Sequence, residues 1–190
     1  MPPLWLGRPC KQSLVDLWTY QAIITETLPD VIVELGAGMG GTSLYLASVC
    51  GVLGHGRVVT VDRSRTHHDD WIGAVRGYRP VAVTDRRTWL LGDLATLEMF
   101  DQIRAFSANG ERTMLIHDAD HDAASVGRDL DLYGRLVTPG CYLIVCDTNI
   151  DGAATARDKF ILEHPEFVVD YACQPDGTWN PGGYLKRGTG

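Results

Sequence analysis

A group of glycines and a following acidic residue are the first positions in this sequence that suggest chemistry. The glycines are Gly36, Gly38, Gly40 and Gly41, directly after a short β-branched run at residues 31–33. A second apolar run, at residues 58–61, ends on Asp62. Glycines allow a sharp backbone turn and the close approach of a ligand, and an acid at the end of the second strand accepts hydrogen bonds from ribose hydroxyls. The spacing therefore indicates a nucleoside-binding site.

The glycine pattern is Gly-x-Gly-x-Gly-Gly, which is close to the dinucleotide fingerprint Gly-x-Gly-x-x-Gly but does not match it. Glu34 stands just before the first glycine, where a carboxylate is placed to hold a cationic group. We therefore expect Glu34, Gly36, Gly38, Gly40 and Asp62 to bind S-adenosyl-L-methionine rather than NAD. The alternative is a tight strand-to-helix turn that holds no ligand.

Polar side chains also follow the next three apolar runs. Asp93 is placed either to reach the adenine end of a bound nucleoside or to cap the next helix. Asp118 and His121 follow the fourth run, and Asp147 and Asn149 follow the fifth. Oxygen ligands of this kind suit Mg2+. Helix caps and turns are the alternative, because aspartate is common in both.

The elements that must position these residues alternate between strands and helices. The predicted strands are residues 31–33, 58–61, 88–91, 113–116, 141–145, 167–169 and 182–186. The predicted helices are residues 12–27, 42–50, 69–76, 94–106, 123–137 and 153–164. This alternation predicts an α/β fold with a mostly parallel central sheet flanked by helices, and we expect an antiparallel strand near the C-terminus. In such a sheet, ligands bind beyond the carboxyl ends of the strands.

The length predicts one domain covering residues 1–190, because the chain is long enough for one buried core and too short for two ordinary domains. Residues 2–9 are predicted to form an extended arm over an apolar surface. The helix that follows carries apolar side chains on or near one stripe, namely Leu14, Leu17, Trp18, Ile24 and Leu28. Core packing is the favoured role of this stripe, and a substrate lid formed by residues 1–28 is compatible with it.

Composition narrows the partners and the compartment. The net charge of -7 and the pI of about 5.2 argue against nucleic acid, so a small-molecule partner is expected. The 5 cysteines include no Cys-x-x-Cys pair, which favours reduced thiols in a cytoplasmic protein. No signal peptide or membrane span is visible in the sequence.

Longer motifs resemble one protein family over nearly the whole chain. They are Trp5-Leu6-Gly7, Asp16-Leu17-Trp18-x-Tyr20-Gln21, Pro29-Asp30-Val31-Ile32-Val33-Glu34, Asp118-Ala119-Asp120-His121, Gly140-Cys141-Tyr142-Leu143-Ile144-Val145-Cys146-Asp147-Thr148 and Asn180-Pro181-Gly182-Gly183-Tyr184-Leu185-Lys186-Arg187. They resemble the cephalosporin hydroxylase family, which is similar to class I S-adenosyl-L-methionine-dependent methyltransferases. The resemblance implies a Rossmann-like fold and an O-methyltransferase of sugars or antibiotics that requires magnesium.

The resemblance also implies roles at the acidic strand ends. Asp118 and Asp147 would be metal ligands, Asn149 or water would complete the shell, and His121 would be the general base. Relatives commonly have a glutamate where this chain has Cys146, whose soft sulfur matches Mg2+ poorly. We therefore expect a weaker metal site. Residues 146 and 147 reach one ion only if the strand bends there, because neighbours in a regular strand face opposite ways.

The expected activity is transfer of a methyl group to a hydroxyl of a small-molecule natural product or sugar. The metal would lower the pKa of the hydroxyl while His121 accepts its proton. A metal-free methyltransferase acting on nitrogen or on a phenol is the first alternative, and a non-catalytic nucleoside-binding protein is the second. The sequence leaves the acceptor open, and a homo-oligomer is possible.

Overall fold

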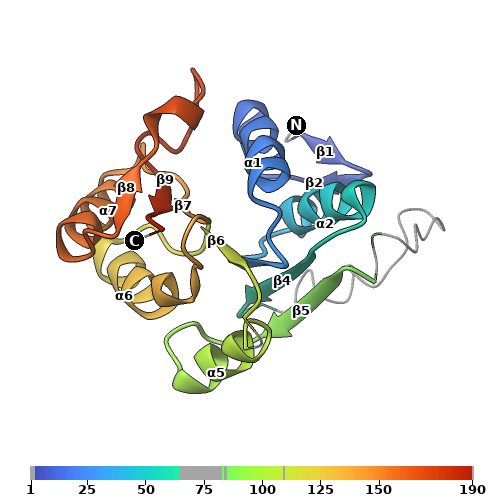
Figure 1. Cartoon of the computed structure of the whole chain (residues 1–190), viewed down its shortest axis with the longest axis horizontal. Coiled ribbons are helices and arrows are strands. Elements are labelled where there is room, and N and C mark those ends of the chain that lie inside the picture. Colours follow the sequence, from blue (N-terminus) through green and yellow to red (C-terminus); the bar gives the residue numbers. More distant parts are fainter. Residues whose placement is uncertain (1–2, 65–82, 84, 109, 190) are drawn as a thin grey trace.

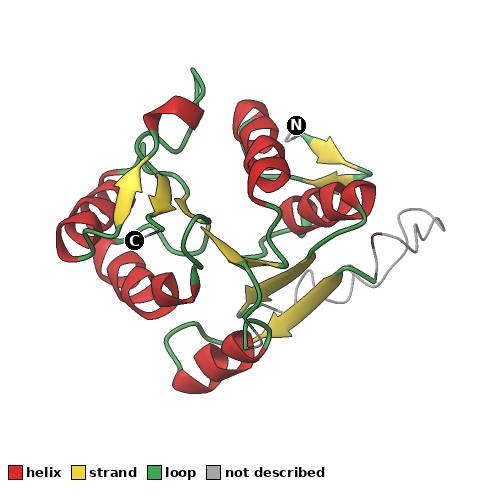
Figure 2. Cartoon of the chain, in the orientation of Figure 1, coloured by secondary structure: helices red, strands yellow, loops and turns green. Residues whose placement is uncertain are grey.

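The structure is a computed structural model that describes residues 3–64, 83, 85–108 and 110–189. Within these residues, a seven-stranded sheet lies between two layers of helices (Figure 1; Figure 2). Its strands are β3 (Val31–Leu35), β4 (Arg57–Asp62), β5 (Arg87–Leu91), β6 (Thr113–His117), β7 (Tyr142–Val145), β8 (Phe167–Val169) and β9 (Tyr184–Arg187).

The strand order is β5-β4-β3-β6-β7-β9-β8. The first five strands in that order are parallel, and β9 pairs antiparallel with both β7 and β8. The predicted fold class, a mostly parallel sheet with an antiparallel strand near the C-terminus, is confirmed.

In-register pairing aligns the ends of four parallel strands. In the β3–β4, β3–β6 and β6–β7 pairings, the last aligned positions are Leu35, Val61, His117 and Val145. The residues at the same edge one step further along each strand are Gly36, Asp62, Asp118 and Cys146. The glycine loop and the acidic strand ends therefore share one edge of the sheet, as the sequence predicted.

Side chains alternate between the two faces of the sheet and form two separate cores. One core contains Ile32 and Ile144 and is covered by α1 (Leu14–Thr27) and α2 (Gly41–Leu53). The other core contains Val33 and Leu143, with helices packed over it. These helices are α5 (Leu97–Ala105), α6 (Ala123–Tyr133) and α7 (Asp151–Glu163). Short 3-10 turns follow at η1 (Gly134–Leu136) and η2 (Tyr171–Cys173).

The buried face of α1 differs from the predicted stripe. Leu17 and Ile24 are buried, but Leu14 and Trp18 are 69% and 74% exposed, and Leu28 is 45% exposed. The buried positions include polar residues instead, among them Asp16, Thr19 and Tyr20. Apolar periodicity misplaced this face because hydrogen bonds, described below, hold its polar side chains in the core. The lid role of residues 1–28 stays a prediction.

Asp16 ties α1 to the C-terminal segment. Its carboxylate is fully buried and accepts hydrogen bonds from the Thr178 hydroxyl, the Trp179 backbone N–H and the Tyr184 hydroxyl. A buried carboxylate is costly unless donors replace water, and here three donors do so. This interaction gives a physical reason for the aspartate in the Asp-x-Trp-x-Tyr-Gln motif.

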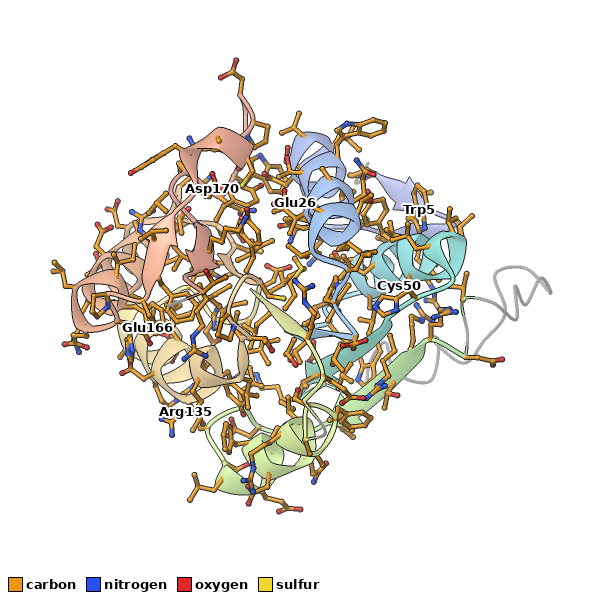
Figure 3. All side chains as sticks on the ribbon, viewed as in Figure 1. Trp5, Glu26, Cys50, Arg135, Glu166 and Asp170 are labelled. Atoms are coloured by element: carbon orange, nitrogen blue, oxygen red, sulfur yellow. The ribbon has the colours of Figure 1, made fainter. Side chains whose placement is uncertain are left out.

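The N-terminal segment is a small hairpin rather than the predicted irregular arm. Strands β1 (Leu4–Trp5) and β2 (Arg8–Pro9) pair antiparallel. Trp5 is labelled in Figure 3. It packs edge-on against Tyr45 of α2, with ring centroids 4.9 Å apart, and its indole N–H donates to Ser48 Oγ. The expected apolar support is therefore present, and the hairpin arises because a turn at residues 6–7 folds the segment back on itself.

Other boundaries differ by a few residues at helix ends. The helix predicted at 94–106 begins later, at Leu97, because Thr96 is its N-cap. The helix predicted at 69–76 lies outside the described residues. All five cysteines are free thiols. Among the described residues, no helix combines the length and apolar character needed to cross a membrane.

Replacing Asp16 tests the tie between α1 and the C-terminal segment. We expect Asp16→Ala to lower the free energy of unfolding by roughly 3 kcal/mol, because three donors, among them the buried Tyr184 hydroxyl, lose their acceptor. Urea unfolding measures the change, with Asp101→Ala as the control because Asp101 is an exposed acid on α5. Equal stability losses in the two variants would contradict the structural role of Asp16.

Candidate active site at the carboxyl edge of the sheet

Two adjoining cavities open at the carboxyl edge of the sheet. The Asp93 cavity, of about 190 Å³, is lined by Asp62, Arg63, Gly92, Asp93, Leu94, Ala119, Asp120 and Arg128. The Asp118 cavity, of about 240 Å³, is lined by Pro9, Lys11, Ala37, Gly38, Met39, Gly41, Thr42, Asp62, Asp118, Ala119, His121 and Asp147. Asp62 and Ala119 line both cavities, so the two spaces adjoin at the end of β4. We call the two cavities together the groove.

The glycine loop and Asp62 are joined by a direct hydrogen bond. The backbone N–H of Gly38 donates to Asp62 Oδ2 at 3.0 Å, and the N–H of Ser64 donates to Asp62 Oδ1. Gly36 has a φ of 95°, and a Cβ there would lie 2.0 Å from the carbonyl oxygen of Asp118. Gly36 is therefore required for the loop to pack on the end of β6, while Gly40 is the N-cap of α2.

Glu34 lies beneath the glycine loop and outside the lining of both cavities. It is fully buried; the hydroxyl of Thr60 donates to its Oε2, and its Oε1 has no hydrogen-bond partner among the described residues. Burial raises the pKa of Glu34 to about 8, and the nearby guanidinium of Arg87 offsets only part of this rise. Its predicted contact with the cofactor stays a prediction.

Three side chains converge at the far end of the Asp118 cavity. One ligand atom from each of Asp118, His121 and Asp147 lies within 4.8 Å of the others. His121 Nε2 is 2.8 Å from Asp147 Oδ2. Two carboxylates and an imidazole at this spacing fit a divalent cation. We call this group the Asp118 cluster.

The electrostatics of Asp118 agree with a site for positive charge. Burial, together with the neighbouring Asp147, raises the pKa of the Asp118 carboxyl to about 8. The amide of Gln12, which donates to Asp118 Oδ2 at 2.8 Å, limits this rise. Lys11 lines the same cavity and also lowers this pKa. A cation held between the two carboxylates would therefore favour their ionised forms.

The chain bends after β7, which is the condition under which residues 146 and 147 could both reach one ion. Asp147 has a φ of 53°, in the left-handed region, and its N–H donates to Asn180 Oδ1 at 2.8 Å. The Cys146 thiol nevertheless lies under α1, 3.3 Å from the Tyr20 hydroxyl oxygen. Burial raises its pKa well above the ordinary value. Cys146 is therefore a neutral buried thiol outside the Asp118 cluster.

The sequence analysis offered helix caps and turns as alternative roles for the acids, and the structure assigns some of these roles. Asp122, rather than Asp118, caps α6 by accepting from the N–H groups of Ala124 and Ser125. Asp93 lines the cavity named after it and accepts from the Ala95 N–H, so it forms a turn rather than a helix cap. Asn149 is exposed in the turn after Asp147, and its role as a metal ligand stays a prediction.

Sequence reasoning missed the polar residues behind the cluster. Gln12 contacts Asp118, Asn180 holds the Asp147 backbone, and Tyr20 lies between them. Asn180 and Tyr20 lie within two of the family motifs, and this membership could have marked them as functional. Gln12 lies before α1 and belongs to no motif or periodic pattern.

A glycine loop after the first strand of the sheet, an acid ending the second, and strand order 5-4-3-6-7-9-8 define the fold of class I methyltransferases. The family described as "Rhamnosyl O-methyltransferase/CmcI" matches residues 3–188. The chain belongs to this family, which confirms the resemblance seen in the sequence.

Relatives of known name agree with this assignment. A rhamnosyl O-methyltransferase of Mycobacterium leprae (strain TN) is 29% identical over 150 residues, covering 78% of this chain and 61% of the relative. The chain thus spans about three-fifths of the length of that curated relative.

Solved structures support the fold. The apo structure of CmcI-N160 superimposes with a TM-score of 0.74 at 21% identity, covering 100% of this chain and 77% of the other. The structure named "cmcI-D160 Mg-SAM" superimposes with a TM-score of 0.74 at 18% identity, covering 97% of this chain and 76% of the other.

The buried acid beneath the loop predicts a pH-dependent stability. Between pH 4.5 and about 8, folded Glu34 keeps its proton while unfolded Glu34 loses it. Unfolding then releases a proton, so stability falls as pH rises through this window, by at most about 1.4 kcal/mol per pH unit.

We expect Glu34→Gln to reduce this slope, because the amide does not titrate; the contribution of Asp118 remains in both proteins. Urea unfolding at several pH values from 5.5 to 7.5 measures the difference. Parallel pH profiles for wild type and variant would show that Glu34 is ionised in the folded state.

Proposed function

We propose that the chain is an S-adenosyl-L-methionine-dependent O-methyltransferase that acts on a hydroxyl group. The observation that carries the proposal is that Asp62 and the glycine loop line the same cavity as the Asp118 cluster. A nucleoside ligand and a proton-accepting site would therefore meet in one space. Membership of the Rhamnosyl O-methyltransferase/CmcI family supports the same activity.

The cofactor would occupy the groove along the loop. In this proposal the Asp62 carboxylate accepts hydrogen bonds from the ribose hydroxyls. Asp93 faces the adenine, and the backbone of Gly38 lies close to the ligand. The structure named "cmcI-D160 Mg-SAM" belongs to a protein of the same fold, which supports the choice of cofactor. When bound, S-adenosyl-L-methionine supplies a methyl group on a positively charged sulfur.

His121 is suited to accept the proton of the hydroxyl. An ionised Asp147 accepts a hydrogen bond and cannot donate one, so the 2.8 Å contact requires the proton of the neutral imidazole to be on Nε2. Nδ1 is then the free acceptor. Asp147 orients the ring and stabilises the imidazolium that forms when Nδ1 takes the proton.

Asp118 and Asp147 would hold Mg2+, with Asn149 as the predicted further ligand. The ion, when bound, would lower the pKa of the hydroxyl that reacts. The half-buried Asp118 carboxylate, with one oxygen engaged by Gln12, keeps the other oxygen available for this role. Cys146 adds no charge to the site, so we propose weak magnesium binding.

The acceptor we propose is a sugar hydroxyl on a small molecule, as in antibiotic biosynthesis. The name of the mycobacterial relative specifies a rhamnosyl acceptor, which supports the sugar class. Five free thiols are consistent with a cytoplasmic setting, where thiols stay reduced. Neither a nucleic-acid nor a membrane partner is part of the proposal, and a homo-oligomer stays a prediction.

Cofactor binding is tested at Asp62. We expect calorimetry to detect S-adenosyl-L-methionine binding to wild type and a roughly tenfold to hundredfold weaker affinity for Asp62→Ala, because a charge-assisted hydrogen bond to ribose is lost. Asp131→Ala, which removes an exposed acid on α6, serves as the control. Unchanged affinity in Asp62→Ala would remove the nucleoside site from this loop.

The proton acceptor is tested at His121. We expect His121→Gln to lower kcat on a rhamnoside acceptor by roughly a hundredfold or more, because the general base is lost, while cofactor affinity stays unchanged. His164→Gln, at the end of α7, is the matched control.

Adding EDTA and then titrating Mg2+ separates the metal-assisted mechanism from the metal-free alternative. Full activity in the presence of EDTA would favour the metal-free methyltransferase, and no methyl transfer to any acceptor would favour the binding protein.

A further inference from the structure

A chain of buried hydrogen bonds joins the two carboxylate residues of the Asp118 cluster from behind. The Asp147 N–H donates to Asn180 Oδ1 at 2.8 Å, and Asn180 Nδ2 donates to the Tyr20 hydroxyl oxygen at 2.9 Å. The Tyr20 hydroxyl donates to Gln12 Oε1 at 3.1 Å, and Gln12 Nε2 donates to Asp118 Oδ2 at 2.8 Å. The three connecting residues come from the start of the chain, from α1 and from the C-terminal segment.

The four hydrogen bonds that link Asp147 to Asp118 share one direction. At one end, a backbone N–H donates, so Asn180 must present its oxygen to Asp147. At the other end, Gln12 Nε2 donates to Asp118 Oδ2, which leaves the Gln12 oxygen to accept from Tyr20. Each amide then has its remaining group facing Tyr20, whose single hydroxyl accepts from Asn180 and donates to Gln12. All four donors therefore point from Asp147 toward Asp118.

The connecting side chains are shielded from water. Gln12 is 3% exposed, and Tyr20 and Asn180 are 0% exposed. In such surroundings a broken hydrogen bond is not replaced by water, and successive bonds of the same direction polarise one another. The thiol of Cys146 lies 3.3 Å from the Tyr20 hydroxyl oxygen and 3.8 Å from Gln12 Nε2. It therefore packs against these hydrogen bonds without adding a charge.

We propose that Gln12, Tyr20 and Asn180 are positioning residues that set the geometry of the Asp118 cluster. Gln12 engages one oxygen of Asp118 and so fixes the plane of that carboxylate, with the other oxygen left for the cluster. Asn180 holds Asp147 in its left-handed backbone conformation. The hydroxyl of Tyr20 couples the two, so that the orientation of the Asp118 carboxylate depends on the backbone position of Asp147. This inference rests on the proposed function of the cluster as a divalent-ion and proton-transfer site.

Tyr20→Phe tests the coupling because it removes one oxygen atom and keeps the ring. Partners of this kind, behind the ligands of a metal site, typically change metal affinity by 10–100-fold, and we expect roughly tenfold weaker Mn2+ binding by electron paramagnetic resonance titration. Tyr142→Phe is the control, since Tyr142 is 1% exposed in the same core and its hydroxyl donates to Asp170, away from the cluster. Thermal melts verify that both variants are folded.

Asn180→Asp tests the direction of the chain. An aspartate still accepts from the Asp147 N–H, but it no longer donates to Tyr20, so the Tyr20 hydroxyl turns toward it and Gln12 Oε1 loses its donor. We expect Mn2+ binding to weaken about as much as in Tyr20→Phe. Wild-type affinity in a folded Tyr20→Phe protein would overturn the positioning role, and wild-type affinity in Asn180→Asp would overturn the direction.

A second measurement tests the hydrogen-bond coupling in the absence of any metal ion. The side-chain amide resonances of Gln12, assigned by nitrogen-15 NMR, should shift in Tyr20→Phe and stay in place in Tyr142→Phe. If wild type binds no Mn2+ but the Gln12 resonances shift as expected, the metal role of the cluster fails and the coupling stands. If they do not shift, the coupling itself is wrong, whether or not the ion binds.

Discussion

In-register parallel pairing of β3, β4, β6 and β7 is the constraint on which the site depends. Each strand ends at the same level, so residues far apart in sequence meet at one edge: Gly36, Asp62, Asp118 and Asp147. A one-residue slip would turn a carboxylate into the core and a core side chain toward the groove. The contact of Gly36 with the Asp118 carbonyl leaves no space for a side chain, so the edge also fixes how closely the loop and β6 approach.

The edge brings acids together, and a second set of residues makes that arrangement stable. Buried carboxylates require donors. Gln12 supplies one to Asp118, while Asp16, further along the same segment, accepts three from the C-terminal region. The start and the end of the chain thus meet behind the cluster. Helix α1 packs apolar residues on the sheet, as most helices do, and it also provides the polar support for the chemistry at the edge.

The sequence was sufficient for the sheet, the loop and the acids at the strand ends, because those depend on local patterns: β-branched runs, glycines and the acid that ends a strand. It was insufficient for the residues behind them. Tyr20 and Asn180 are 160 residues apart, and neither follows an apolar period. The predicted stripe on α1 placed Trp18 inward for the same reason, since periodicity registers apolar residues and α1 also buries polar ones. The fate of Cys146 depended on the backbone bend at Asp147, which no local pattern specifies.

The tie between Asp16 and residues 178–184 has a consequence for how the protein is made. Ribosomes release the N-terminus first, at roughly 5–20 residues per second. The partners of Asp16 lie 162 to 168 residues later, so the wait is on the order of ten seconds or more. Until that segment is made, the Asp16 carboxylate on α1 has no donors from residues 178–184, and burying it against the growing sheet is unfavourable. The final docking of α1 therefore depends on residues 178–184, which are synthesised long after α1 itself.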